Sequence, residues 1–339
     1  MINFQMAKNK NNSLSQFPPL VFNVFKPARM TSYDVIRHFK RNLPAGFGKI
    51  GHFGTLDPFA CGVMLIGIGG AARLNEYIHD MLPKTYLAIG KLGIETPTGD
   101  YESEIIQRDE SLYLKREIAS FSSEFIEERL REKFMGDYLQ APHKYSASKF
   151  LGRNMHQWAR EGIEVKKEPV LRHIYDIQVV KYKFPYLSVR VTVSSGTYVR
   201  TLFNHMSNEL GTIGSLVALV REKIGDISSH DGLKRPLWPH EKNLDVIKHG
   251  IRIDDVLPFD KIHLNGSQIT SFKCGAFLRP ENLNFERIKE NFSSKLFWIL
   301  DEEKNLMGMG HHSFPNEIRP KINFHLEVQD ETSFHHGLK

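Results

Sequence analysis

The chain has 339 residues, of which 41% are hydrophobic, and a formal net charge of +6. This length and composition allow two domains, or one large domain with an appendage, and exclude a chain that is disordered throughout. The basic excess is compatible with a polyanionic partner such as nucleic acid. Two cysteines, Cys61 and Cys274, cannot build a disulfide framework.

Nothing in the sequence indicates a metal centre or a membrane segment. Neither cysteine has a second cysteine or a histidine at zinc-ligand spacing. The N-terminal residues, "MINFQMAKNKNNSLSQFPP", lack an apolar stretch of signal-peptide length, and no later run is long enough to span a bilayer. We therefore expect a cytoplasmic protein in a reducing compartment, with no metal and no membrane contact.

Periodicity and capping residues predict the elements of the N-terminal part. After a polar leader at 1–19, "LVFNVFKP" is typical of a short buried strand, and "MTSYDVIRHFKRNL" of a helix capped by Thr31 with Asp34 three residues later. "GVMLIGIGGAARLNEYI" combines an apolar run, a glycine-rich turn and a helix. "KTYLAIGKLG" predicts a strand and "EFIEERLREKF" a helix.

The following part of the chain is first basic and then again regular. Residues 140–172 interleave basic side chains with aromatic residues and histidine. "YDIQVVKYKFPYLSVRVTVSSG" predicts two strands joined near Phe184-Pro185. "TYVRTLFNHMSNELG" predicts a helix that is capped by Thr197 and stopped by Gly211.

One glycine-rich stretch allows a different interpretation of the fold. Gly67, Gly69 and Ala72 fit the G-x-G-x-x-A pattern of dinucleotide-binding proteins, and Glu95 follows a second strand-like segment. No repeated alternation of strands and helices follows, although a doubly wound sheet requires it. An NAD-dependent oxidoreductase is therefore the less favoured alternative, and a packing turn is the simpler explanation.

The stretch "GHFGTLDPFACGV", residues 51–63, places a single carboxylate, Asp57, between turn-forming glycines, a proline and an apolar run. An aspartate in a turn commonly bonds nearby backbone amides, which needs no catalytic role. An ionised carboxylate aimed at an electrophilic carbon is also a nucleophile, and a neighbouring guanidinium would keep it ionised. Arg200 and Tyr86 are candidate partners, although a surface arginine and a strand tyrosine explain each of them equally well.

Five stretches, in this order, resemble the TruB family, the tRNA pseudouridine-55 synthases. They are "FKPARMTSYDVI", "GHFGTLDPFACGVMLIGIGGAARL", "KTYLAIGKLGIETPTGD", "APHKYSASKFLGRNMHQWAREGIEV" and "SSGTYVRTLFNHMSNELG". Together they lie within residues 25–225, roughly three fifths of the chain. Five ordered motifs are more specific than one, so the resemblance favours a role for Asp57 beyond that of a turn residue.

The resemblance implies an α+β fold, in which a mixed, largely antiparallel sheet with flanking helices is followed by a small β-rich, PUA-like domain at the C-terminus. We accordingly expect a disordered leader at 1–19, a pseudouridine synthase catalytic domain at 20–257, and within it an RNA-binding segment at about 136–172. A PUA-like RNA-binding domain would occupy 258–326 and a loose tail 327–339. Short strand-like pieces after Leu257 agree with this, and 281–294 resembles an insertion.

The resemblance also implies roles for individual residues. Asp57 would be the catalytic nucleophile, Arg200 would pair with it, and Tyr86 would stack on the target uracil and assist proton transfer. The RNA would be contacted by a second set: Tyr198 and Leu219 in the uridine pocket, His52 in the stack that the flipped base vacates, and Lys26 and Lys149 at the backbone.

Four positions depart from the family pattern, and none of them is a proposed catalytic group. Cys61 stands in place of threonine, Arg73 in place of lysine, His156 in place of tyrosine, and Val220 in place of the first of two arginines. One RNA or structural contact of the family is therefore in question at Val220.

The implied reaction is the isomerisation of uridine to pseudouridine at position 55, in the T-loop of tRNA. The bond from uracil N1 to ribose C1′ breaks and the base rejoins through C5, which needs no cofactor. The target base must be flipped out of the loop before a side chain can reach it. We expect the T-arm of tRNA as the partner, and a monomer that requires no protein partner.

Other functions remain compatible with the same residues. A non-catalytic tRNA-binding chaperone is the alternative outside the enzymes, and the intact set of Asp57, Tyr86 and Arg200 favours an enzyme over it. A guide-RNA-dependent relative is the alternative within the enzymes, and the self-contained motifs favour the stand-alone type. The sequence leaves open whether Asp57 attacks C1′, adds to C6 or assists the departure of uracil.

Overall fold

A computed structural model describes residues 17–141, 149–161, 163, 165, 168–234, 245–279, 284–285, 296–313 and 317–324. Most of the expected leader, most of the 281–294 insertion and the expected tail lie outside these residues, so the expectations for them stay predictions. No helix in the described ranges is both long enough and apolar enough to cross a membrane.

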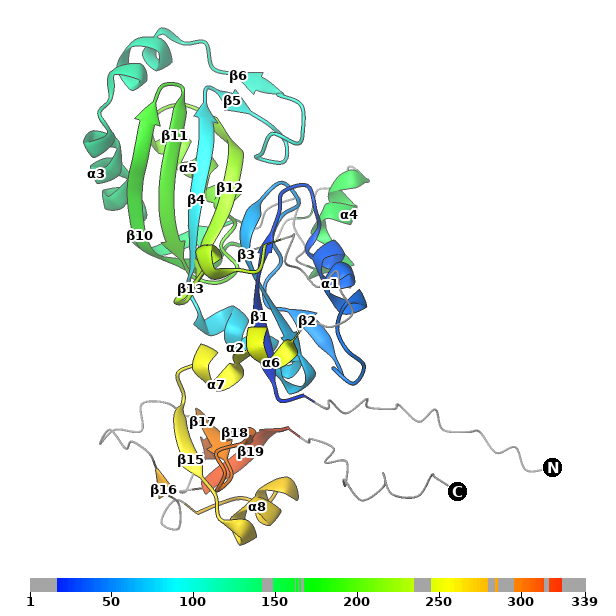
Figure 1. Cartoon of the computed structure of the whole chain (residues 1–339). Coiled ribbons are helices and arrows are strands. Elements are labelled where there is room, and N and C mark those ends of the chain that lie inside the picture. The colour runs from blue at the N-terminus through cyan, green and yellow to red at the C-terminus, as the bar shows by residue number, and fades with distance from the viewer. Residues whose placement is uncertain are drawn as a thin grey trace, which may run out of the picture.

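A ten-stranded sheet forms the body of the molecule (Figure 1). Its strands follow the order β14-β1-β3-β12-β4-β11-β10-β7, with β2 beside β3 and β13 beside β12. Their bounds are β1 Leu20–Lys26, β2 Ile50–His52, β3 Cys61–Ile68, β4 Lys84–Leu92, β7 Gly136–Gln140, β10 Val170–Lys183, β11 Tyr186–Val193, β12 Gly214–Ile224, β13 Ile227–Ser228 and β14 Ile251–Arg252.

The pairing in this sheet decides between the two folds that the sequence allows. Within the described residues, β3 and β12 pair in parallel, and every other pair of this sheet is antiparallel. The predicted largely antiparallel sheet is confirmed, and the dinucleotide-binding interpretation is wrong, because a doubly wound sheet consists of parallel strands. Gly67 lies inside β3, where an added Cβ would come within 2.4 Å of the Phe53 ring, so close packing accounts for this glycine.

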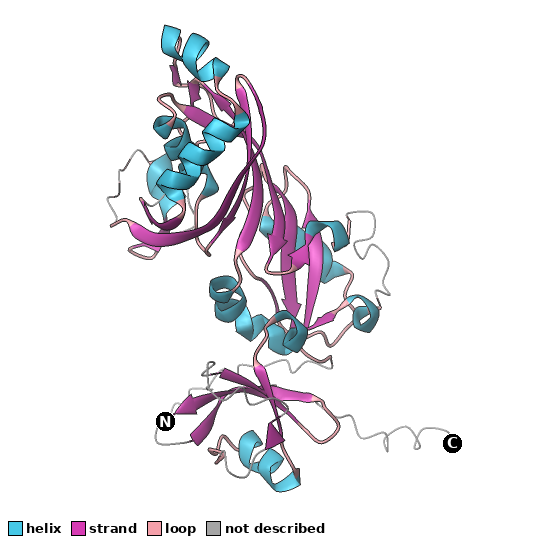
Figure 2. Ribbon diagram, turned by 90° about the vertical axis from the view of Figure 1, so that its left-hand side faces the viewer, coloured by secondary structure: helices cyan, strands magenta, loops and turns pink. Residues whose placement is uncertain are grey.

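Two helices cover one face of the half of the sheet that contains β4, β10, β11 and β12. They are α3 Ser123–Phe134 and α5 Val199–Glu209, and Figure 2 shows helices along this side of the strands. The apolar residues that recur at helical spacing in both stretches are buried and pack against strand residues in one cluster: Ile126, Leu130 and Phe134 from α3, and Leu202, Phe203 and Met206 from α5. Sequence periodicity therefore predicted these two core faces correctly.

The capping residues predicted for α1 and α5 have different outcomes. In α1, Ser32–Arg41, the Thr31 and Asp34 side chains form the reciprocal capping box. In α5 the predicted cap Thr197 is wrong by one residue: Tyr198 occupies the N-cap position without a side-chain cap. The Thr197 hydroxyl instead donates to the Ser194 carbonyl, 2.9 Å away, inside the preceding turn.

The remaining elements before residue 258 are short. They are the 3-10 helix Gly69–Leu74, α2 Asn75–Met81, β5 Ile94–Glu95, β6 Gln107–Arg108, the π-helical turn Leu114–Ile118, β8 Lys149–Phe150, β9 Arg153–Asn154, α4 Met155–Arg160, the 3-10 turn Ser229–Asp231, α6 Val246–His249 and α7 Ile253–Val256. Among these, β5 pairs with β6 and β8 with β9, each as a two-stranded ribbon.

A second, smaller sheet follows and packs on α2 and α7 (Figure 1). Its order is β16-β15-β17-β18-β19, with β15 Asp260–His263, α8 Gly266–Lys273, β16 Asn284–Phe285, β17 Leu296–Leu300, β18 Leu306–Ser313 and β19 Glu317–Asn323. Trp298 is fully buried, and its indole N–H donates to the Leu257 carbonyl at 2.8 Å. The predicted β-rich character of the C-terminal part is confirmed.

The parallel junction of β3 and β12 generates a prediction about stability. Gly62 has φ of +117°, and an added Cβ would lie 2.2 Å from the Arg221 carbonyl oxygen on β12. Gly62→Ala therefore requires the two strands to separate. Gly136 also has positive φ, at +87°, but has no atom within 4 Å of the added Cβ.

We expect Gly136→Ala to lower the free energy of unfolding by about 1–2 kcal/mol, which is the cost of the left-handed backbone alone. Gly62→Ala should cost roughly 3 kcal/mol or more, because backbone atoms must also move. Urea denaturation of the two variants measures both values. Equal losses would show that the junction accommodates a side chain.

Candidate active site

Asp57 lies in the connection between β2 and β3, residues 53–60, named here the Asp57 loop. Ser32, the first residue of α1, is buried and holds this loop by two hydrogen bonds to one residue. Its hydroxyl donates to the Leu56 carbonyl at 3.1 Å and accepts from the Leu56 amide at 3.0 Å. The backbone next to Asp57 is thereby fixed to the start of α1.

Arg221 also holds the Asp57 loop. Its side chain is almost completely buried, and its guanidinium donates to three carbonyl oxygens: Val63 at 2.7 Å, Gly54 at 3.1 Å and Thr55 at 3.4 Å. One cation thus binds carbonyls of both the loop and β3. The loop backbone is accordingly set by β12, which lies far away in the sequence.

Lys26 also supports the loop, which corrects the expected contact of Lys26 with the RNA backbone. The side chain is fully buried, and its ammonium donates to the carbonyls of Pro27, Met30 and Pro58 at 2.9, 2.6 and 3.2 Å. Burial lowers the pKa of Lys26 to about 8. Because Pro58 follows Asp57 directly, Lys26 positions the loop and presents no exposed ammonium to a phosphate.

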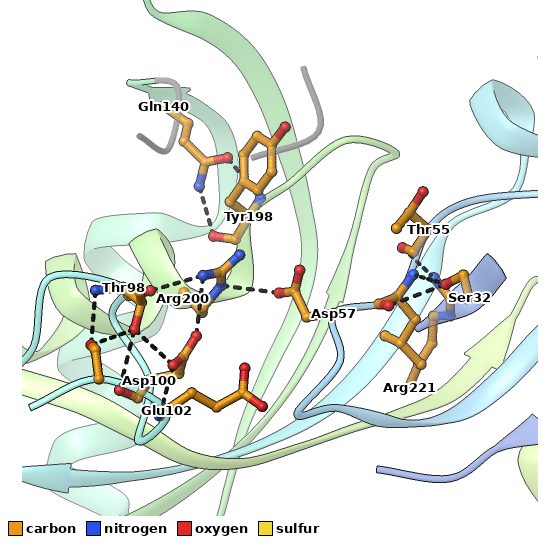
Figure 3. Close-up of polar contacts among 12 residues, drawn as sticks. Ser32, Thr55, Asp57, Thr98, Asp100, Glu102, Gln140, Tyr198, Arg200 and Arg221 are labelled. Carbon is orange, nitrogen blue, oxygen red and sulfur yellow. Dashed lines mark hydrogen bonds and ion pairs between the residues drawn. The ribbon is translucent and has the colours of Figure 1, made fainter. Parts of the chain in front are cut away.

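Arg200 joins two carboxylates at the centre of the site (Figure 3). Its Nε lies 3.0 Å from Asp57 Oδ2, and its Nη1 lies 3.1 Å from Asp100 Oδ2 and donates to the Thr98 carbonyl at 2.9 Å. The guanidinium is 6% exposed and Asp100 is 3% exposed, whereas Asp57 keeps 34% of its side chain exposed. Arg200, Asp57 and Asp100 are named here the carboxylate trio. Arg200 and Asp100 are buried, and only the Asp57 carboxylate of the trio is partly exposed.

The trio also determines the protonation of Asp57. Burial raises the pKa of Asp57 above the ordinary aspartate value; the Arg200 guanidinium opposes this shift, and the nearby Asp100 carboxylate adds to it. Burial, together with Asp100 and Asp57, likewise raises the pKa of Glu102. Asp57 is thus less well solvated than a surface carboxylate, which is a property of reactive groups.

Asp57 faces a cleft of about 290 Å³, and the cleft brings together several of the residues predicted from the sequence. Tyr86, Tyr198 and Leu219 line it together with Asp57. Tyr86 comes from β4, Leu219 from β12 and Tyr198 from the start of α5. Two aromatic rings and an aliphatic side chain beside a carboxylate suit a flat, partly polar ring such as a nucleobase.

Two further residues, His52 and Lys149, were predicted to contact the RNA, and His52 is absent from the lining of this cleft. His52 ends β2, and its half-buried ring has no hydrogen-bond partner at Nδ1 among the described residues. Burial and the charge of Arg221 lower the pKa of His52. Lys149 begins β8, opposite Asn154, and its side chain lies outside the described part of the structure, as does much of the segment 142–167. The RNA roles of both residues stay predictions.

Gln140 is a contributor that the sequence did not reveal. It is buried at the end of β7, its amide nitrogen donates to the Tyr198 carbonyl at 3.0 Å, and its amide oxygen accepts from the Tyr198 N–H at 2.8 Å. A single side chain thus pairs with both backbone groups of Tyr198, as a neighbouring strand would (Figure 3). The N-terminal end of α5, which carries Arg200, is held in place by this contact.

Asp100, Ser32 and Arg221 were also missed as parts of the site. Asp100 closes the turn "TPTGD" after β5, where its Oδ1 accepts from the Thr98 hydroxyl at 2.8 Å and the Glu102 amide at 3.0 Å. A buried acid cannot be distinguished from an ordinary turn aspartate by sequence. Ser32 follows a helix cap and carries no signal of its own. Arg221 is the retained second arginine of the family's pair, but its strand position gave no sign that it holds the Asp57 loop.

The described residues contain no group of three or more histidine, cysteine, aspartate or glutamate side chains placed to hold a metal ion. Asp57 is paired with the Arg200 guanidinium, and the carbonyl oxygens of its loop accept hydrogen bonds from Lys26 and Arg221. The arrangement is therefore suited to nucleophilic or acid–base chemistry by one carboxylate on a bound ring compound.

Comparison with known proteins gives the family. Residues 40–199 match the model of the TruB family pseudouridylate synthase N-terminal domain. Among curated relatives, tRNA pseudouridine synthase B of Clostridium kluyveri is 33% identical over 291 residues, which cover 86% of this chain and 94% of the relative. The enzyme of the same name from Thermotoga maritima is 34% identical over 278 residues, covering 76% and 84%.

Solved structures of low sequence identity share the fold. A chain from a Cbf5-Nop10-Gar1 complex superposes with a TM-score of 0.64 at 20% identity, covering 90% of this chain and 84% of that one. A chain from an H/ACA RNP bound to a substrate RNA containing 2′-deoxyuridine gives 0.63 at 18% identity, covering 90% and 85%. With the motif order, the sheet topology and the near full-length relatives in agreement, this chain belongs to the TruB family of pseudouridylate synthases.

Proposed function

We propose that this chain converts uridine to pseudouridine at position 55, in the T-loop of tRNA, with Asp57 as the nucleophile. Membership of the family makes the chain a pseudouridine synthase, an isomerase. The observation that carries the assignment of Asp57 is its pairing: a buried guanidinium holds one side of the carboxylate, while the other side remains open to the cleft.

The lining of the cleft gives each neighbouring residue a role in this proposal. Flipping the uridine out of the loop costs a few kcal/mol, and stacking on Tyr86 returns about 1–3 kcal/mol. Tyr198 and Leu219 enclose the base, and His52 takes the place that it leaves in the RNA. Arg200 keeps Asp57 ionised against the effect of its burial.

The position of Asp57 is compatible with three routes to the product. Its carboxylate attacks C1′ and releases uracil, or assists the loss of uracil with a proton removed from C2′, or adds to C6 of the base. In each route the base rotates in the closed cleft and the new bond forms at C5. The supports of the loop, Ser32, Lys26 and Arg221, act by positioning Asp57 for all three.

The rest of the chain serves RNA binding in this proposal. The catalytic domain occupies 20–257, with the basic segment at about 136–172 as its RNA-binding part, and the PUA-like domain at 258–326 binds the remainder of the tRNA. The relatives that share about a third of their residues with this chain are named as tRNA enzymes. This favours a stand-alone enzyme over a guide-RNA-dependent one. The chains from the H/ACA RNP and the Cbf5-Nop10-Gar1 complex are only 18–20% identical to this chain.

Release of tritium from unmodified tRNA labelled at C5 of uridine tests the proposal. We expect Asp57→Asn to lower the rate by about 10³-fold or more and to leave tRNA binding within about twofold, because the variant loses the nucleophile but keeps the cleft. Asp231→Asn, at a side chain that is 76% exposed, is the matched control and should keep the full rate.

Each other outcome of this assay contradicts part of the proposal. Binding without tritium release by the unaltered chain would favour the chaperone or another target. Release by Asp57→Asn at a near-normal rate would remove Asp57 from the reaction. Absence of both binding and release would reject a tRNA substrate.

The pH dependence of the reaction tests the carboxylate trio. Because the pKa of Asp57 is raised, the single-turnover rate should fall on acidification with a midpoint above the ordinary aspartate value of 3.8. Asp100→Asn removes a negative charge that raises this pKa, so the acidic midpoint should move to lower pH. Asp231→Asn should leave the midpoint unchanged. An unchanged or raised midpoint in Asp100→Asn would show that Asp57 does not control the acidic limb.

A further inference from the structure

Three strand ends meet at one end of the cleft and bring a group of polar side chains together. In register, Lys84 at the start of β4 pairs with Val193 at the end of β11, and Val193 pairs with Ile174 of β10. The turn 194–197 therefore lies beside Lys84 on one side and beside Arg172 on the other. We name Lys84, His79, Arg172 and Ser195 the strand-end cluster.

Hydrogen bonds hold one cation of the cluster on the turn and the other on α2. Arg172 Nη1 donates to the Ser195 carbonyl at 3.1 Å, and Lys84 Nζ donates to the His79 carbonyl. An added Cβ at Gly196 would lie 2.9 Å from the Arg172 guanidinium carbon. Because glycine has no side chain, the guanidinium can lie directly against the turn. Lys84, His79, Ser195 and Gly196 all line the same cleft as Asp57.

Several donors of the cluster lack an acceptor within the described part of the chain. Arg172 Nε and Ser195 Oγ are buried without a hydrogen-bond partner there. The backbone N–H groups of Ser195 and Gly196 donate in none of the hydrogen bonds between described residues. Gly196 has φ of +75°, and successive N–H groups beside such a residue form a concave site for an anion. Buried donors without a partner are unfavourable, so the cluster is suited to an acceptor from outside the chain.

The charges around the cluster favour a negatively charged acceptor. His79 feels the cations of Lys84, Arg221 and Arg172, and the acid that acts on it is Asp80, on the exposed side of α2. Burial and the charge of Arg221 lower the pKa of Lys84 to about 8, which means that they disfavour its charged form. An anion beside Lys84 would stabilise that form. Asp57, the acid within the cleft, is already paired with Arg200.

We propose that the strand-end cluster binds one phosphate of the RNA backbone next to the flipped nucleotide. The inference rests on the proposed function, since it takes RNA as the occupant of the cleft. A guanidinium, an ammonium, a hydroxyl and two backbone N–H groups match the oxygens of a phosphodiester. Holding the phosphate at one end of the cleft fixes the ribose relative to Asp57 at the other.

The test neutralises phosphates one at a time. Stem-loop RNAs of T-arm sequence, each with a single methylphosphonate at one of the positions around the target uridine, are measured by filter binding. With the unaltered chain, one position should raise Kd by about tenfold, the loss of one charge-assisted contact. Arg172→Met should raise Kd for the all-phosphate RNA by a similar factor, and the methylphosphonate at that same position should then have no further effect.

Two other variants separate this result from a folding defect. Lys84→Met should mask the same methylphosphonate position, because it removes the second cation of the cluster. Lys91→Met, on the opposite face of β4, should bind every RNA like the unaltered chain. Thermal unfolding of each variant checks that the sheet is intact.

The outcomes distinguish the phosphate site from the proposed function. If the increases in Kd caused by the methylphosphonate and by Arg172→Met multiply at every position, the cluster holds no phosphate. This result would leave the proposed function intact where the unaltered chain still forms pseudouridine from the unmodified stem-loop. Masking at a position remote from the target uridine would also overturn the proposal. Absence of binding and of product with the unmodified stem-loop would reject the proposed function and this site with it.

Discussion

The site depends on one guanidinium that is shared by two carboxylates. Arg200 is buried between Asp57 and Asp100, so it neutralises one charge of the pair and leaves the trio with an excess of negative charge. Taking these groups out of water is unfavourable, and their mutual attraction, together with the hydrogen bonds of the surrounding turns, offsets the cost. Removing Arg200 would leave two carboxylates without their cation, so the elements that carry the three side chains have to be placed together.

Each of those elements is held by side chains that bond backbone. The loop of Asp57 is tied by Ser32, Lys26 and Arg221, and the start of α5 by Gln140. Such contacts suit a loop that must be rigid without being part of a sheet, because the carbonyls and amides that it cannot pair in a ladder still find partners. The consequence is a carboxylate whose orientation is set before any substrate arrives.

The sequence predicted the framework better than it predicted these supports. Apolar periodicity located β1, β3, β4, α3 and α5, and the capping box of α1 could be read from Thr31 and Asp34. Asp57, Tyr86 and Arg200 were found through the resemblance of ordered motifs. The contributions of Asp100, Gln140 and Ser32 to the site could not be predicted. They depend on burial and on contacts with residues far along the chain, which the local sequence does not show. For the same reason Lys26 was expected to contact the RNA backbone, because a lysine beside a proline gives no sign in the sequence of being buried.

The junction of β3 with β12 also bears on how the chain reaches its native state. The hydrogen bond from Arg221 to Val63 joins residues 158 positions apart, and the bond from Arg221 to Gly54 in the Asp57 loop spans a similar separation. Closing a connection of this length costs chain entropy before any of its contacts form, which places it late in folding. The Asp57 loop therefore acquires its geometry only when nearly all of the larger sheet has been assembled. A nascent chain that has emerged only as far as α5 has both charges of the Asp57–Arg200 pair but not the strand that orients them.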